Sequence, residues 1–65
     1  MINVDKLKKL MVQNNVTNRE LAVHVGLTES MMSYVTRGLR EPSLAALIRI
    51  AKFLDTSVDE LIVKE

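Results

Sequence analysis

The sequence predicts an all-α protein built from five short helices, and three observations lead to this fold class. Apolar residues recur at intervals of three and four along most of the chain, as they do on one face of a helix. No segment has the strict alternation of apolar and polar residues that is typical of a half-buried strand. Because the 65 residues include only two glycines and one proline, most of the chain is expected to lie in helices.

The first two helices are expected at about residues 3–14 and 18–25. Consecutive asparagines end the first helix, and Thr17 is a suitable N-cap for the second. Glu20 stands three residues after Thr17, which is the spacing of a capping box. The residues expected to face the core are Val4, Leu7, Leu10 and Met11 in the first helix and Leu21, Ala22 and Val25 in the second.

Three more helices are expected at about residues 29–36, at about 44–54 and from about 57 onward. Gly26 and Gly38 stop the second and third helices, because glycine readily adopts the left-handed conformation just beyond a helix. Thr28 and Ser43 are placed to cap the third and fourth helices. The residues expected to face the core are Met32, Val35 and Leu39, then Leu44, Leu47, Ile48, Ala51 and Leu54, and finally Val58, Leu61 and Ile62.

Length and composition restrict the possible functions. A chain of 65 residues predicts one small domain over residues 1–65, near the lower size limit for a core without cross-links. With no cysteine and one histidine, His24, neither a metal site nor another cofactor is expected. The chain lacks a nucleophile–base pair and the mass to enclose a substrate pocket, so we expect neither an enzyme nor a small-molecule substrate. Since it shows no signal peptide and no membrane-spanning run, we expect a cytoplasmic protein without a membrane partner.

The charges are unevenly distributed, although the net charge is only +1. Residues 1–54 carry eight of the nine basic residues and four of the eight acidic ones, a net charge of +4. Residues 55–65 carry the remaining four acids and one lysine, a net charge of −3. The basic part is suited to a polyanion, with the acidic tail pointing away from it, but ordinary mixing of surface charges gives the same pattern.

The second and third predicted helices form a helix-turn-helix candidate over about residues 18–36. The tight turn "VGLT" joins them and contains the glycine typical of this motif. On the third helix, residues 30, 33, 34 and 37 share the face opposite the apolar one. Their short polar chains, phenol and guanidinium suit contact with base edges and phosphates. A solvated helix surface is the alternative interpretation of the same face.

Residues 16–61 carry a recognisable order of short motifs. The run "VTNRELAVHVGLTESMMSYVTRGLREPSLAALIRIAKFLDTSVDEL" resembles the Cro/phage-repressor (Xre) type of helix-turn-helix protein. Each motif is weak by itself, but the ordered set at these spacings is specific, and it implies a lambda-repressor-like domain. The matching positions are Thr17, Glu20-Leu21-Ala22, Gly26-Leu27-Thr28, Arg37-Gly38, Pro42-Ser43, Leu44, Leu47, Ile50-Ala51, Leu54 and Val58-Asp59-Glu60-Leu61.

The resemblance implies a set of DNA contacts at these positions. In the family, the start of the third helix reaches base edges in the major groove, while the start of the second helix and the basic residues after the third lie near phosphates. The implied base contacts are Glu29, Ser30, Ser33 and Tyr34. The implied phosphate contacts are Asn18, Thr28, Arg37 and Arg40.

Several residues depart from the family pattern. Glu29 either accepts a hydrogen bond from cytosine N4 or is only a favourable charge at a helix N-terminus. Met31 either touches a thymine methyl group or completes the edge of the core. Thr36 replaces an acid common in the family, which removes an expected local ion pair. Glu41 lies in a loop where many relatives are basic, so it is expected to lower the affinity for phosphate.

The resemblance therefore implies a sequence-specific regulator of transcription that binds double-stranded DNA, most simply a repressor. A homodimer is expected, because one recognition helix reads too few base pairs and two half-sites supply the rest. Leu39, Ile62 and Val63 are candidates for its interface. The alternative function is a protein-interaction module of the same fold, such as an antitoxin-like or anti-repressor component, that binds through its acidic C-terminal helix or the Met31 region.

Overall fold

The structure is a computed structural model that describes residues 1–63, and it contains five α-helices over that range. They are α1 (Val4–Gln13), α2 (Asn18–Val25), α3 (Glu29–Thr36), α4 (Leu44–Phe53) and α5 (Val58–Leu61). All five lie within one or two residues of the positions predicted from sequence. The only β-type pairing among the described residues is an isolated antiparallel bridge between Ile2 and Ile62.

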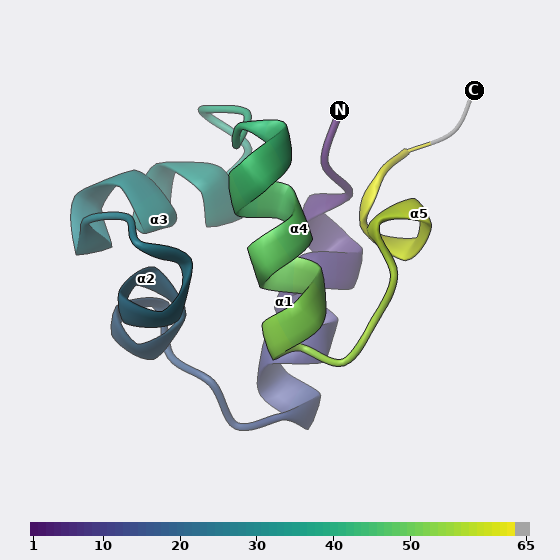
Figure 1. Cartoon of the computed structure of the whole chain (residues 1–65), viewed down its shortest axis with the longest axis horizontal. Helices are drawn as coiled ribbons and strands as arrows, with labels where there is room; N and C mark the ends of the chain where they lie inside the picture. The colour runs from purple at the N-terminus through teal and green to yellow at the C-terminus, as the bar shows by residue number, and fades with distance from the viewer. Residues whose placement is uncertain (64–65) are drawn as a thin grey trace.

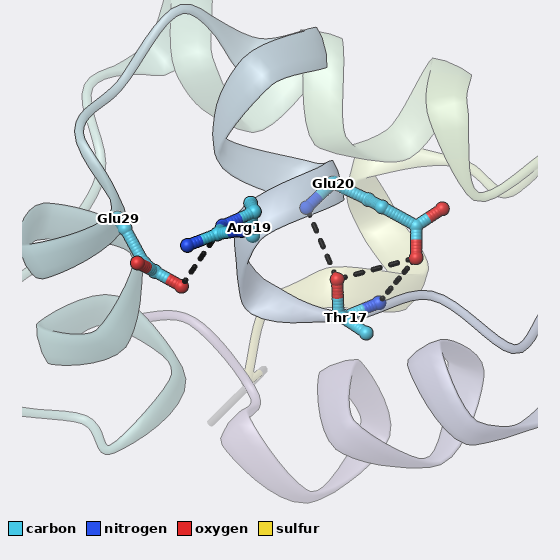
Figure 2. Close-up of polar contacts among 4 residues, drawn as sticks. All are labelled: Thr17, Arg19, Glu20 and Glu29. Carbon is cyan, nitrogen blue, oxygen red and sulfur yellow. Dashed lines mark hydrogen bonds and ion pairs between the residues drawn. The ribbon is translucent and has the colours of Figure 1, made fainter.

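Each helix begins at a polar residue whose side-chain oxygen accepts a hydrogen bond from a backbone N–H three residues later. The accepting residues are Asn3, Thr17, Thr28, Ser43 and Ser57, at distances of 3.1 to 3.2 Å. At α2 the capping box is complete, because Glu20 Oε1 also accepts from the Thr17 backbone N–H (Figure 2). Each cap stabilises its helix by about 1 kcal/mol, since it satisfies a donor that has no partner within the helix.

The first four helices end at a residue in the left-handed conformation. These residues are Asn15 (φ 55°), Gly26 (φ 83°), Gly38 (φ 75°) and Asp55 (φ 55°). In every case the next residue donates its backbone N–H to a carbonyl five residues earlier, as in a Schellman motif. Asn and Asp tolerate this conformation better than other residues with a side chain, so the chain reverses sharply without a glycine at two of the four ends.

The helices surround one core. Helix α2 packs against α3 and α4, α4 packs against α5, and α1 packs against α3 and α5. In Figure 1 the pair α2 and α3 lies on one side of the molecule and α5 lies on the other. The fully buried side chains at the centre are Leu7, Leu21, Val25, Met32, Val35, Ile50, Leu54 and Leu61.

Three residues that the sequence placed in the core are exposed instead. Leu39 is 63% exposed because it follows Gly38, where the chain has already turned away from the axis of α3. Leu44 and Ile48 are 68% and 38% exposed, whereas Ala46 and Ile50 are buried. Nearly every residue of α4 is apolar, so its sequence offers two possible inward faces, and packing against α2 and α5 selects one of them.

The N-terminal residues lie along the segment that follows α5. The backbone N–H of Asn3 donates to the Leu61 carbonyl at 2.7 Å, and that of Val63 donates to the Met1 carbonyl at 2.9 Å. The backbone N–H of Ile2 donates to Glu41 Oε2 at 3.0 Å. Glu41 therefore ties the loop before α4 to the N-terminal segment, a role its sequence position did not reveal. Two charges of the tail, Lys64 and Glu65, lie outside the described residues.

Candidate nucleic-acid interface

Helices α2 and α3 are held together by a turn of three residues, Gly26 to Thr28. The turn needs a left-handed residue at Gly26, and Thr28 then caps α3. Helix α4 also holds the start of the turn, because Arg49 Nη1 donates a hydrogen bond to the Val25 carbonyl at 3.2 Å. A cation at the C-terminus of α2 also complements the helix dipole. This arrangement fixes the orientation of α3 relative to α2.

The outward face of α3 carries the four predicted base contacts. Met32 and Val35 are fully buried on the inner side, as predicted. Glu29 and Ser30 are exposed, Tyr34 is 41% exposed, and Ser33 is half-buried. The structure therefore places all four on one accessible helix. Met31 is half-buried, at the boundary between the two faces.

Arg37 and Arg40 follow the third helix and are exposed. Arg37 Nε donates to the Ser33 carbonyl at 3.3 Å, so its guanidinium closes the end of α3. The same guanidinium lies 5.3 Å from the centroid of the Tyr34 ring, within the range of a cation–π contact. These contacts orient the positive group beside the predicted base-reading residues while leaving it accessible.

The start of α2 presents Asn18 beside a hollow of about 300 Å³. The hollow is lined by Lys8, Met11, Val12, Val16, Asn18 and Thr36. Asn18 Oδ1 is buried and finds no hydrogen-bond partner among the residues that the structure describes. The Nδ2 group carries the donors of the amide that a phosphate contact would use.

The capping hydroxyl groups near this surface keep part of their hydrogen-bonding capacity. Thr28 Oγ1 accepts from the Met31 backbone N–H at 3.1 Å, but its own O–H proton remains available to an acceptor such as phosphate. Thr36 is buried, and its Oγ1 donates to the Ser33 carbonyl at 3.1 Å. The threonine that replaces the family's acid is therefore satisfied within its own helix.

Arg19 is a charged residue of this surface that the sequence analysis did not single out. Its Nε lies 3.8 Å from Glu29 Oε2, so an ion pair bridges the first turns of α2 and α3 (Figure 2). The two side chains are 80% and 58% exposed. Patterns along a single helix give no sign of this pair, because its members come from different helices.

The remaining polar features lie elsewhere. His24 is exposed and stacks on Phe53, with ring centroids 4.1 Å apart. Within residues 1–63, no cluster of three or more His, Cys, Asp or Glu residues could hold a metal ion. Over the same range, no helix has the length and apolar character needed to cross a membrane.

The sequence pattern of the helix-turn-helix family matches residues 7–61, from the first turn of α1 to the end of α5. The chain belongs to the helix-turn-helix family, of the Cro/C1 type. The family pattern thus includes both helices of the motif and the three helices that support them.

Individual relatives agree with this assignment. The HTH-type transcriptional regulator AnsR of Bacillus subtilis (strain 168) is 34% identical over 64 residues, which cover 98% of this helix-turn-helix chain and 55% of AnsR. The chain therefore spans about half the length of that relative.

Two solved structures are similar in fold. The restriction-modification controller protein C.AhdI from Aeromonas hydrophila has a TM-score of 0.82 at 30% identity, covering 91% of this chain and 89% of that one. The N-terminal DNA-binding domain of SinR from Bacillus subtilis has a TM-score of 0.82 at 27% identity, covering 95% of this chain and 91% of that one. The predicted all-α, lambda-repressor-like fold is confirmed.

Proposed function

We propose that this helix-turn-helix chain is a sequence-specific regulator of transcription that places α3 in the major groove of double-stranded DNA. The observation that carries the proposal is the polar, accessible face of α3 on a motif that matches the family over residues 7–61. The proposal agrees with two similar proteins, because AnsR is an HTH-type transcriptional regulator and SinR has an N-terminal DNA-binding domain. Repression requires only that the protein occupy its operator, so we propose a repressor.

The base contacts in this proposal come from Glu29, Ser30, Ser33 and Tyr34. The serine hydroxyls donate and accept, so each can bond to several base edges, and Glu29 is an acceptor suited to cytosine N4. Tyr34 lies beside Arg37 on the accessible face, and in this proposal its hydroxyl contacts a base or the sugar-phosphate backbone. Accessibility on one face of one helix supports this assignment.

The phosphate contacts come from Asn18, Thr28, Arg37 and Arg40, which flank α3 on both sides. The free backbone N–H groups at the start of α2 and the positive end of its dipole favour an anion next to Asn18. Each neutralised phosphate releases bound counterions, so the affinity should fall steeply as salt rises. Replacing Arg37 by Ala should weaken binding to all sequences alike and make the logarithmic salt slope shallower by about one unit.

The protein acts on DNA as a homodimer in this proposal. Half-sites one helical turn apart place two recognition helices about 34 Å from each other. The Cα trace measures 30 × 22 × 19 Å, so two domains in contact side by side have a suitable separation. The exposed apolar side chains Leu39, Leu44 and Val63 are candidates for the contact between the copies. Sedimentation equilibrium with and without operator DNA measures the oligomeric state directly.

The first experiment is selection of binding sites from random duplex DNA by the purified protein at near-physiological salt. A two-fold symmetric site with half-sites about one turn apart supports specific binding and the dimer together. An asymmetric half-site would contradict the proposed homodimer but would still agree with the proposed function as a regulator of transcription. If the folded protein enriches no sequence, the DNA-binding proposal fails and a protein-interaction module becomes the better interpretation.

A further inference from the structure

We propose that Arg19 and Glu29 act together as one base-reading unit, in which Arg19 holds the Glu29 carboxylate for a hydrogen bond from the N4 amino group of a cytosine. The inference rests on the proposed function, because it concerns the same surface of α2 and α3. It assigns Arg19 a role in sequence preference and decides between the two roles that the sequence left open for Glu29.

Arg19 and Glu29 occupy positions in their helices that differ in how well they suit the helix dipole. Glu29 is the first residue of α3, where the positive end of the helix dipole favours a carboxylate. Arg19 is the second residue of α2, where the same dipole disfavours a cation. Helix stability alone therefore explains Glu29 but not Arg19. A negative partner outside α2 removes the disadvantage, and Glu29 supplies it at 3.8 Å.

The paired side chains keep hydrogen-bonding capacity for DNA. The contact joins one guanidinium nitrogen, Nε, to one carboxylate oxygen, Oε2. A carboxylate accepts through two oxygens with about four lone-pair sites, so a cytosine amino group can bind without displacing Arg19. The guanidinium has five N–H donors, so donors remain for a phosphate while Nε faces Glu29. Both side chains are mostly exposed, and DNA can approach them.

The electrostatic potential of the major groove also favours a paired carboxylate over a free one. An acidic side chain that enters the major groove is repelled by the phosphates on both edges unless a cation accompanies it. Figure 2 shows Arg19 and Glu29 facing each other between the first turns of the two helices. The pair is close to neutral, so Glu29 can approach a base without that repulsion. Removal of Arg19 should therefore affect the base that Glu29 reads more than any other base.

The test measures dissociation constants for the selected operator and for the three other base pairs at each position. The proteins are the wild type, Arg19→Ala, Glu29→Gln and the double variant, with Lys52→Ala as a control for the loss of one positive charge. Lys52 is exposed in the last turn of α4. Circular dichroism at the binding temperature verifies that each variant is folded.

The wild type should prefer cytosine at one position by about 5-fold to 150-fold, the range of a good side-chain contact to a base edge. Arg19→Ala and Glu29→Gln should each lose most of that preference and keep the preferences at all other positions. The double variant should be no worse than Glu29→Gln at that position, because Arg19 acts there through Glu29. Lys52→Ala should leave every preference unchanged.

Three results would overturn the inference. If Arg19→Ala weakens binding to every sequence equally and leaves all base preferences intact, Arg19 is only a phosphate contact and the proposed regulator function stands. If Glu29→Gln retains the cytosine preference, the carboxylate does not read that base. A wild-type protein that selects no sequence would overturn the proposed function together with this inference.

Discussion

Replacing Gly26 by Ala should destabilise the protein by about 2 kcal/mol. Gly26 ends α2 with φ at +83°, and a residue with a side chain pays about 1–2 kcal/mol for that conformation. An added Cβ would also lie 3.2 Å from Arg49 Nη1 and disturb the hydrogen bond from this group to the Val25 carbonyl. Such a bond contributes about 0.5–1.5 kcal/mol, of which we expect part to be lost.

The loss is large for a domain of this size. Typical stabilities per residue give a 65-residue chain roughly 3–10 kcal/mol in total. For domains of 60–100 residues, 1 kcal/mol shifts Tm by about 4–8 °C, so Gly26→Ala should lower Tm by roughly 8–16 °C. Thermal unfolding followed by circular dichroism measures this shift, and urea titration gives the free energy of unfolding.

Two control variants separate the two causes. Asn tolerates the left-handed conformation, so Gly26→Asn should lose less stability than Gly26→Ala although its Cβ meets the same Arg49 nitrogen. In a protein that already carries Arg49→Ala, Gly26→Ala should lose only the stability that the left-handed conformation at residue 26 accounts for. A Tm for Gly26→Ala within 2 °C of the wild type would refute the claim that this turn requires a left-handed residue.

Three further predictions concern the core, a helix cap and the N-terminal segment. Leu47→Ala should lower the free energy of unfolding by about 2–5 kcal/mol and Leu44→Ala by less than about 0.5 kcal/mol, because Leu47 is 8% exposed and Leu44 is 68% exposed. Equal losses in urea unfolding would contradict the observation that α4 buries Leu47 and exposes Leu44. Thr17→Ala should cost about 1 kcal/mol, measured by thermal unfolding, and Thr17→Ser should restore most of it because it keeps the capping hydroxyl. Glu41→Ala should speed hydrogen exchange of the Ile2 amide about fivefold, as expected for the loss of one bond worth about 1 kcal/mol, and Glu41→Gln should preserve the protection. An unchanged exchange rate in Glu41→Ala would show that the bond from Ile2 to Glu41 contributes nothing.

The boundaries of the helices could be predicted because they depend on chemistry within a few residues. Thr17, Thr28 and Ser43 cap helices with their own side chains, and Gly26 and Gly38 end helices through their own backbone freedom. These effects need no knowledge of the rest of the fold. For the same reason the predicted helix-turn-helix at about residues 18–36 agrees with α2 and α3.

Contacts between distant parts of the chain could not be predicted in this way. Helix α4 is apolar on several sides, so its sequence did not reveal that Leu44 and Ile48 face outward while Ile50 faces the core. The bond from the Ile2 backbone to Glu41 joins residues 39 positions apart. Arg19 and Glu29 also meet only because two helices pack at one particular angle.

By itself the sequence determined the fold class, the positions of the five helices and the helix-turn-helix family, since these follow from periodicity, caps and an ordered set of motifs. The assignment of Glu29, Ser30, Ser33 and Tyr34 to bases remains a prediction based on the family. The tertiary structure alone decided which apolar faces are buried and which charges lie together. The physical reason is that burial and ion pairing depend on distances between elements, which local sequence patterns do not contain.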